Sequence, residues 1–173
     1  MVKSVLLFVL IGVFSLNGFT QEEAVEQEKK NLITVAFGYT YIPNGAALDA
    51  HEADGVFIPS IGLDYFRRIN PHWEIGIMAD FEFGEYIVFD KNLNRENAIL
   101  FAAMANYNLT KHFSFLAGGG MELERHKNLA IIRVGSEYVF RLKKEWLITP
   151  GFFYDFKEGF DTWALSVGIG KEF

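Results

Sequence analysis

From Asn31 to Phe173 the chain alternates between large apolar or aromatic side chains and small, polar or charged ones. The clearest run is the last one, in which Trp163, Leu165 and Val167 share a parity with Ile169 and Phe173, while threonine, alanine, serine, glycine and glutamate occupy the other parity. Successive side chains of a β-strand point to opposite faces, so the pattern predicts strands with one bulky apolar face and one small polar face. A soluble barrel turns its apolar face inward. Here we expect the bulky face to contact lipid and the polar face to line the interior.

Eight segments carry this alternation, and each has the length of a tilted strand that crosses a bilayer. They comprise residues 32–41, 56–67, 73–83, 98–109, 113–124, 129–140, 146–156 and 162–173. Tight links at 69–72, 110–112 and 141–145 contrast with long ones at 42–55 and 84–97. An even number of antiparallel strands lets the sheet close and brings both ends of the chain to the same side. The sequence therefore predicts an all-β fold, an eight-stranded antiparallel up-and-down transmembrane β-barrel over residues 31–173.

The composition suits a membrane barrel. Aromatic residues make up 16% of the chain, and Tyr and Trp rings are expected to form belts at the two membrane interfaces. Cysteine is absent, which excludes a disulfide framework, a thiolate metal site and a cysteine nucleophile. A net charge of -6 argues against a nucleic acid partner, because a phosphate backbone requires a basic surface. No cofactor is implied.

The N-terminus has the pattern of an export signal. Lys3 precedes an apolar run over residues 5–14, and small residues follow before Thr20. We expect a signal peptide over residues 1–20, because the apolar run is too short for a confident membrane-spanning helix. Residues 21–30 are mostly Glu, Gln and Lys, and we expect them to form a flexible periplasmic tail.

Two soluble folds compete with the membrane barrel. A secreted lipocalin-like binding barrel also has eight strands, but about four bulky side chains per strand exceed the room inside such a barrel. A two-layer β-sandwich would bury the apolar parity between its sheets, and alternation alone does not separate stacking from closure. The observation that separates them is whether the first strand, near Val35, pairs with the last, near Val167.

Charged residues gather on the parity that we expect to line the lumen. Because side chains roughly fill an eight-stranded barrel, we expect them to form a hydrogen-bonded network in a closed lumen, without an open pore. We assign this lumen charge network to Asp80, Glu82, Glu122, Arg133, Glu137 and Asp155. Asp64, Glu74 and Glu124 share the parity, and Arg133 is the clearest inward base. A divalent cation held by carboxylates at the outer half is a second explanation for the acidic excess.

The chain resembles the small outer-membrane β-barrels of diderm bacteria, the broad OmpA/OmpX-like eight-stranded group. The resemblance rests on the export signal, the eight amphipathic segments, the Asn-Pro-His-Trp step at 70–73 and the ending Ser-Val-Gly-Ile-Gly-Lys-Glu-Phe at 166–173. It implies a location in the bacterial outer membrane. It also implies outer-membrane lipids as partners and the barrel-assembly machinery during biogenesis, with Val167, Ile169 and Phe173 as the assembly signal.

For function, the pattern favours a structural or adhesive role through the long links around residues 46–55 and 85–96, with an unknown external partner. A lipid-A-modifying enzyme of the outer membrane is the alternative. Such an enzyme needs a nucleophile beside a base near the outer leaflet. His126 lies beside Glu124, but Ser136 is about 33 Å further along the strand. We therefore expect no catalytic site and no enzyme activity. The number of strands also disfavours a small-solute channel.

Overall fold

The computed structural model describes residues 29–48, 52, 55–88 and 93–173. The expected signal peptide and all but the last two residues of the expected tail lie outside this part of the chain. The long strands are β1 (Asn31–Ile42), β3 (Val56–Arg68), β4 (Trp73–Val88), β5 (Leu93–Asn108), β6 (Phe113–Leu123), β7 (Leu129–Tyr138), β9 (Trp146–Lys157) and β10 (Asp161–Glu172). Shorter elements are β2 (Gly45–Ala46), β8 (Phe140–Arg141) and the 3-10 helix η3 (Lys143–Glu145). Within the described residues no helix has the length and apolar character needed to cross a membrane.

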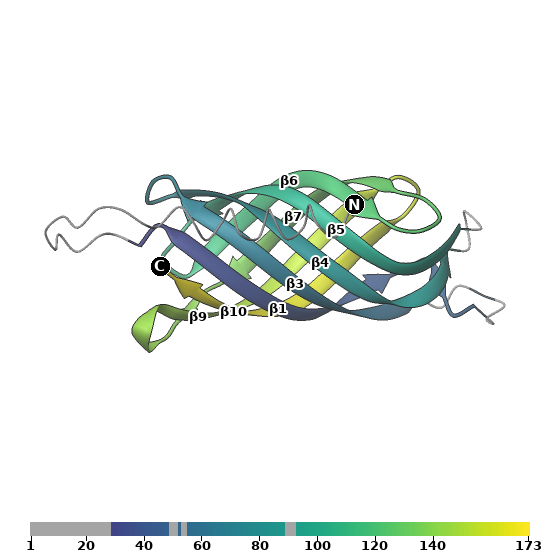
Figure 1. The fold of residues 1–173 in the computed structure, drawn as a ribbon, viewed down its shortest axis with the longest axis horizontal. Helices are drawn as coiled ribbons and strands as arrows, with labels where there is room; N and C mark the ends of the chain where they lie inside the picture. The colour runs from purple at the N-terminus through teal and green to yellow at the C-terminus, as the bar shows by residue number, and fades with distance from the viewer. Residues whose placement is uncertain (1–28, 49–51, 53–54, 89–92) are drawn as a thin grey trace, which may run out of the picture.

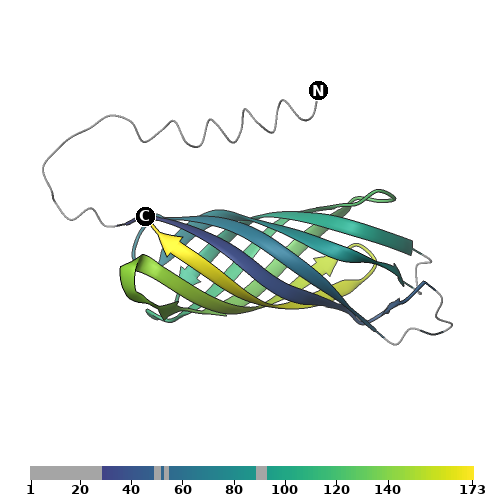
Figure 2. The same ribbon diagram turned by 60° about the horizontal axis from the view of Figure 1, so that its bottom comes forward.

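The long strands form one antiparallel sheet that closes on itself (Figure 1). Each long strand pairs with the next one in the chain, and β10 pairs with β1 along the seam visible in Figure 2. In this seam Val35 lies opposite Ile169, and Phe37 lies opposite Val167. Closure confirms the expected eight-stranded antiparallel barrel. It excludes the two-layer sandwich, because a sandwich leaves the edges of its sheets unpaired.

Apolar side chains cover the outer wall of the barrel. Phe37 is 54% exposed, Ile77 is 56% exposed and Val167 is 48% exposed. On the opposite parity, polar groups such as Asp64 and Thr34 are buried. A lipocalin-like carrier would shield the first three side chains inside, so that alternative is wrong. A continuous apolar wall of this kind requires an apolar solvent, and the hydrocarbon core of a bilayer provides it.

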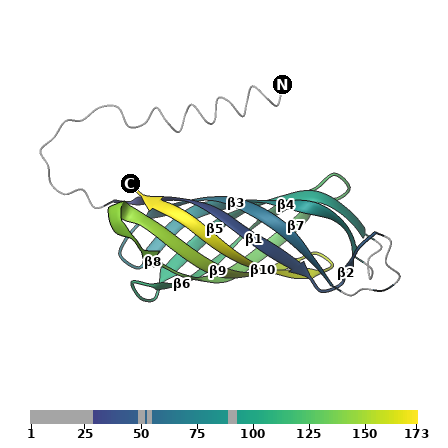
Figure 3. The ribbon, with the colours of Figure 1, turned by 90° about the horizontal axis from the view of Figure 1, so that it is seen from below.

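The two ends of the barrel differ. The turn end contains the start of β1, the end of β10 and the tight turns, and the loop end is the opposite one, where β2 lies (Figure 3). At the turn end, Asn70 Oδ1 accepts hydrogen bonds from the backbone N–H groups of His72 and Trp73 at 2.9 and 3.0 Å. Thr110 Oγ1 makes the equivalent bonds in the next turn. Side chains that cap the backbone in this way stabilise tight turns without glycine.

Aromatic rings pack at both ends of the wall. At the loop end, the Tyr41 ring centroid lies 4.7 Å from that of Phe57 and 4.9 Å from that of Trp163. At the turn end, the Trp73 and Tyr107 centroids are 4.9 Å apart. These positions match the two aromatic belts expected at headgroup depth.

The prediction of a long loop over residues 84–97 is wrong, because most of this segment is β-structure. β4 continues to Val88 and β5 begins at Leu93, and these two residues pair. β2 adds to this hairpin, with Gly45 opposite Val88 and Ala46 opposite Ile87. We call residues 45–46, 85–88 and 93–96 the loop-end extension. The apolar and β-branched residues at 86–88 pair across the hairpin, which explains why the ladder continues past the barrel wall.

The glycines at 118–120 lie in β6, and their reason is steric. A Cβ atom added to Gly118 or Gly120 would meet the backbone of Ala103 or Phe101 in β5. These two glycines therefore allow β6 to pack closely against β5. All three glycines continue the strand.

An arginine placed on the outer wall tests its contact with lipid. Leu63 is 54% exposed in the middle of β3, and Leu63→Arg should lower the free energy of unfolding by about 2–4 kcal/mol, the cost of Arg near the bilayer midplane. Leu48 is 56% exposed just beyond β2, and Leu48→Arg should change it by less than about 0.5 kcal/mol. Urea unfolding in phospholipid vesicles, followed by tryptophan fluorescence, measures both. Equal losses would contradict a lipid-facing wall.

Candidate functional site

The middle of the lumen is organised around the Arg133 guanidinium. Arg133 projects inward from β7 and is 3% exposed. Its Nε and Nη2 atoms donate to the two carboxylate oxygens of Asp155 on β9, at 2.7 and 2.9 Å. Its Nη1 atom donates to Asp80, which comes from β4 across the lumen. The planar guanidinium suits this arrangement because it binds one carboxylate with two donors and still has a donor for another.

A second charged cluster lies at the loop end. Glu122 on β6 accepts from Arg95 and lies 2.5 Å from the Lys157 ammonium, and all three side chains are fully buried. Arg95 also donates to Glu124 at 3.1 Å and to the Lys127 carbonyl at 2.5 Å. Two cations therefore share one buried carboxylate. These cations compensate part of the acidic excess on the inward parity. The carboxylates of the outer half, which could have held a divalent cation, are instead bound by cations of the protein.

Glu82 lies beside the loop-end cluster. It is 2% exposed, and Thr40 contributes a side-chain hydrogen bond to its carboxylate. The opposite charge that acts on it most strongly is the Lys157 ammonium. Glu82 thereby connects the β1 wall to the cations that come from the loop end.

The inward position of Arg95 departs from the sequence parity, and a β-bulge explains the departure. Counting in twos from Ala98 would turn Arg95 outward. The ladder between β4 and β5 shifts between Glu82 and Glu85, and Asn97 adopts a φ of 46°. Asn97 Oδ1 accepts a hydrogen bond from the Gly84 N–H at 3.1 Å. Asn tolerates this left-handed conformation. The step from Glu82 to Glu85 on β4 matches the shorter step from Ala98 to Glu96 on β5, so β4 carries one extra residue and the parity of β5 reverses beyond Asn97.

Lys157 was missed for a simpler reason. The expected strand ended at Phe156, and Lys157 fell in the following link. In the structure β9 includes Lys157, which continues the inward parity of Phe153 and Asp155. A one-residue error at the end of a strand therefore hid a buried cation.

An apolar cap closes over the loop-end cluster. Ile42, Val88 and Leu129 have no exposed surface, and Tyr86 and Phe160 are 2% and 5% exposed. Ile42 precedes β2, and Tyr86 and Val88 belong to the loop-end extension, so the extension and the strand ends pack together over the mouth. Sequence parity did not find this cap, because all of its members except Leu129 were placed in links and because their contacts join distant parts of the chain.

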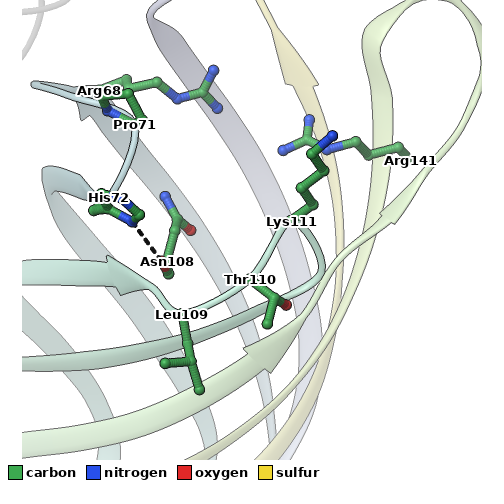
Figure 4. A pocket seen from close by; sticks show the side chains of 8 residues that line it. All are labelled: Arg68, Pro71, His72, Asn108, Leu109, Thr110, Lys111 and Arg141. Atoms are coloured by element: carbon green, nitrogen blue, oxygen red, sulfur yellow. Dashed lines mark hydrogen bonds between the residues drawn. The ribbon is translucent and has the colours of Figure 1, made fainter.

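Four charged side chains are joined by hydrogen bonds at the turn-end mouth. Arg68 donates to Glu74 at 3.1 Å and to Glu172 at 2.9 Å, and Arg141 donates to Glu172 at 2.8 Å. A pocket of about 500 Å³ opens beside them, and Arg68, Lys111 and Arg141 reach it from three different segments (Figure 4). Lys111 has no ion pair with a described residue. This mouth is therefore basic at its surface, with Glu172 bridging the two arginines and Glu74 bound to Arg68.

Not every inward acid has a cation. Asp64 is 4% exposed, and its Oδ1 atom has no protein hydrogen-bond partner. Glu137 forms no ion pair with any described residue. Of the six residues assigned to the network, Arg133, Asp80 and Asp155 are in direct contact. Glu122 pairs with Arg95 and Lys157, and Glu82 lies beside Lys157. Glu137 lies apart from these pairs.

The assembly-signal residues share the outer wall. Val167 is 48% exposed, Ile169 is 49% exposed and Phe173 is 50% exposed. The backbone N–H of Phe173 donates to the Asn31 carbonyl at 2.8 Å, and the Asn31 N–H donates back at 3.1 Å. The C-terminal strand is thus held to β1 to its last residue, and the recognition of these three side chains stays a prediction.

His126 and Glu124 form a contact outside the membrane-spanning strands. The His126 ring Nδ1 lies 2.8 Å from Glu124 Oε1, and backbone N–H groups of His126 and Lys127 donate to Glu124 Oε2 at 2.9 and 3.3 Å. Burial alone would raise the pKa of Glu124, but these hydrogen bonds and Arg95 hold it below the usual range. Among the described residues no hydroxyl group is hydrogen-bonded to His126. The contact between His126 and Glu124 therefore stabilises the loop, and it lacks the adjacent nucleophile that acyl transfer requires.

Among the described residues, the inward carboxylates are not arranged as metal ligands. Within the described part of the chain no three His, Asp or Glu side chains are arranged to hold a metal ion. Two carboxylates of the outer half, Glu122 and Asp155, are bound by Lys157 and Arg133.

Removing the central cation should destabilise the barrel strongly. Arg133→Met leaves Asp80 and Asp155 buried without a counter-charge, and we expect a loss of about 3–5 kcal/mol in the free energy of unfolding. Arg125→Met removes an exposed pair with Glu96 and should cost less than about 1 kcal/mol. Urea unfolding in vesicles measures both. Restoration by the added changes Asp80→Asn and Asp155→Asn is expected, and an unchanged midpoint in Arg133→Met would contradict the assigned network.

Comparisons with solved structures return barrels of the same kind. The chain is similar to Ail, the attachment invasion locus protein of Yersinia pestis, solved with the heparin analogue sucrose octasulfate: identity is 12%, 85% of this chain and 100% of that chain are covered, and the TM-score is 0.59. It is also similar to the Neisserial surface protein A, with 8% identity, coverage of 83% and 97%, and a TM-score of 0.59.

At these identities the likeness concerns the fold. No protein-family model and no curated protein matches the sequence. The resemblance to the small eight-stranded group is confirmed at the level of the fold. The closed eight-stranded sheet and these structural neighbours show that the chain has the fold of small outer-membrane β-barrel proteins, and its apolar outer wall suits a lipid bilayer.

Proposed function

We propose that this protein is a closed, non-conducting barrel that acts as a rigid scaffold and presents its loop end for contact with other surfaces. The observation that carries the first part is the set of ion pairs that cross the lumen. Arg133 binds carboxylates from β4 and β9 in the middle, while Arg95 and Lys157 share Glu122 beneath the apolar cap.

The size of the barrel supports a closed lumen. Eight strands leave an interior that side chains roughly fill. The inward side chains of this chain include arginine, phenylalanine, methionine and leucine, and Phe153, Met104 and Leu116 are each less than 5% exposed. An ion would have to displace paired charges at two levels and pass an apolar cap.

Conductance tests the closed lumen. We expect the refolded protein to give no single-channel steps in a planar bilayer, because the ion pairs and the cap block a continuous water path. Empty proteoliposomes provide the baseline. Steps in the wild-type protein whose size changes in Arg133→Gln would place an ion path beside Arg133 and would overturn this part of the proposal.

The loop-end extension supports the second part. It is a paired β-structure anchored by the buried cap, so it presents its exposed residues from a stiff base. Its contact area is small, which suits a limited surface interaction better than a large stable complex. A solely structural role in the membrane is the other reading of the same scaffold.

The charge of the loop end indicates which surfaces fit. Its exposed acids outnumber the exposed bases Arg125 and Lys127, which themselves pair with Glu96 and Glu158. Ail was solved with a polyanionic heparin analogue. An acidic loop end repels such a ligand, so for this chain we propose a cationic or neutral contact surface.

Cell retention on charged surfaces tests the surface role. Expression of the wild-type protein should raise retention of bacteria on polylysine-coated glass but not on heparin-coated glass. Neutralising exposed loop-end acids with Glu52→Gln, Glu85→Gln and Glu158→Gln should remove the gain, because the attraction depends on their charge. Glu145→Gln, at an exposed acid of the turn end, is the matched control and should keep it. A gain on heparin, or none on either surface, would contradict the proposal.

We further infer that outer-membrane lipids contact the apolar wall, and that the barrel-assembly machinery binds Val167, Ile169 and Phe173 during biogenesis. Support comes from the exposure of all three side chains on one face of the C-terminal strand.

A further inference from the structure

We propose that a groove on the outer wall near the turn end is a binding site for one anionic phospholipid. The groove has a volume of about 770 Å³ and crosses β3, β4, β5 and β6. It is apolar along most of its length and has a cation at one end. Its outward side chains are Tyr65, Arg67, Ile75, Ile77, Ala103, Ala105 and Ala117.

The depression arises from small side chains between large ones. Ala103 and Ala105 on β5 and Ala117 on β6 occupy outward positions, and most outward positions of the wall carry aromatic or branched residues. Their neighbours Phe101 and Phe115 are 48% and 50% exposed and stand above them. A methyl group projects much less than a phenyl ring, so the wall is hollowed over two strands. An acyl chain that lies in the hollow gains apolar contact on three sides.

Arg67 supplies the charge. It lies on the outward parity of β3, together with Leu63 and Tyr65, in the last turn-end residues of the strand. Its one hydrogen bond is from Nη1 to Asn31 Oδ1 at 3.3 Å, and Tyr65 donates to the same oxygen at 2.8 Å. No described carboxylate pairs with Arg67. An arginine at the membrane interface with free donors suits a phosphate group, which it can bind with two of them.

The alternative occupant is a second copy of the chain, and its charges do not fit. Two copies inserted in the same orientation would meet turn end to turn end. The outward acids of the long strands are Glu85, Glu96 and Asp161, and all lie toward the loop end. At the turn end the exposed acid Glu145 already pairs with Lys29 at 2.6 Å, so a second barrel would cover Arg67 without a free described counter-charge, which is costly. A phospholipid brings its phosphate and its acyl chain together, so it satisfies both ends of the groove.

Lipid retention tests the charge. The full chain is refolded into nanodiscs of phosphatidylcholine with a minor share of phosphatidylglycerol, extracted in mild detergent and examined by native mass spectrometry. We expect one retained phosphatidylglycerol per barrel. Arg67→Gln should reduce the bound fraction about fivefold, the effect of one cation near an anionic headgroup. Lys171→Gln is the matched control, because Lys171 is outward at the same end, does not line this groove and lies 5.6 Å from the Trp146 ring centroid.

A second pair of variants tests the groove. Ala105→Leu fills the hollow and should abolish retention, whereas Ala79→Leu adds the same bulk at an outward position of β4 outside the groove and should not. Heat-modifiable electrophoretic mobility verifies that each variant folds. Retention that is insensitive to Arg67→Gln and Ala105→Leu would mean non-specific lipid and would overturn the proposal. Dimers in the wild-type protein that Ala105→Leu disperses would assign the groove to a second copy and would overturn it as well.

Discussion

Pairing between β1 and β10 is the interaction on which the rest of this structure depends. In hydrocarbon no water can satisfy a backbone N–H or C=O group, so a sheet with a free edge is not stable there. The seam supplies partners for both edges along the whole length of the two strands, from Leu32 opposite Glu172 to Tyr41 opposite Trp163. Only once the sheet is closed do the two parities acquire different environments, lipid outside and a narrow polar lumen inside.

Closure has an electrostatic consequence. The lumen of an eight-stranded barrel gives charged groups little water, and each buried charge needs a partner. This chain places its buried cations at different heights, with Arg133 in the middle and Arg95 and Lys157 near the loop end. Two of these pairs join strands that are not neighbours in the sheet, β4 and β7 through Asp80 and Arg133, and β6 and β9 through Glu122 and Lys157. The same ion pairs that compensate the buried charges also stiffen the barrel and support the scaffold role.

The sequence predicted the outer wall of the barrel better than its interior. The strand positions, their antiparallel order and the direction of Val35, Phe37 and Val167 followed from a two-residue period, because a side chain on a regular strand has only two directions. Arg95 did not follow, because the bulge at Asn97 reverses the period and a bulge has no reliable signal in one sequence. The cap around Ile42, Val88 and Leu129 was hidden for another reason, since links far apart in the chain meet there.

By itself the sequence determined that this chain is a lipid-facing β-barrel, because alternation, strand length and the placement of aromatic rings are local properties. It also determined which residues are available to the lumen. Only the tertiary structure decided which charges pair, how the loop end is capped and that a row of alanines becomes a groove ending at Arg67. Those outcomes depend on distances between strands that are remote in the chain, and the closing register of the sheet sets these distances.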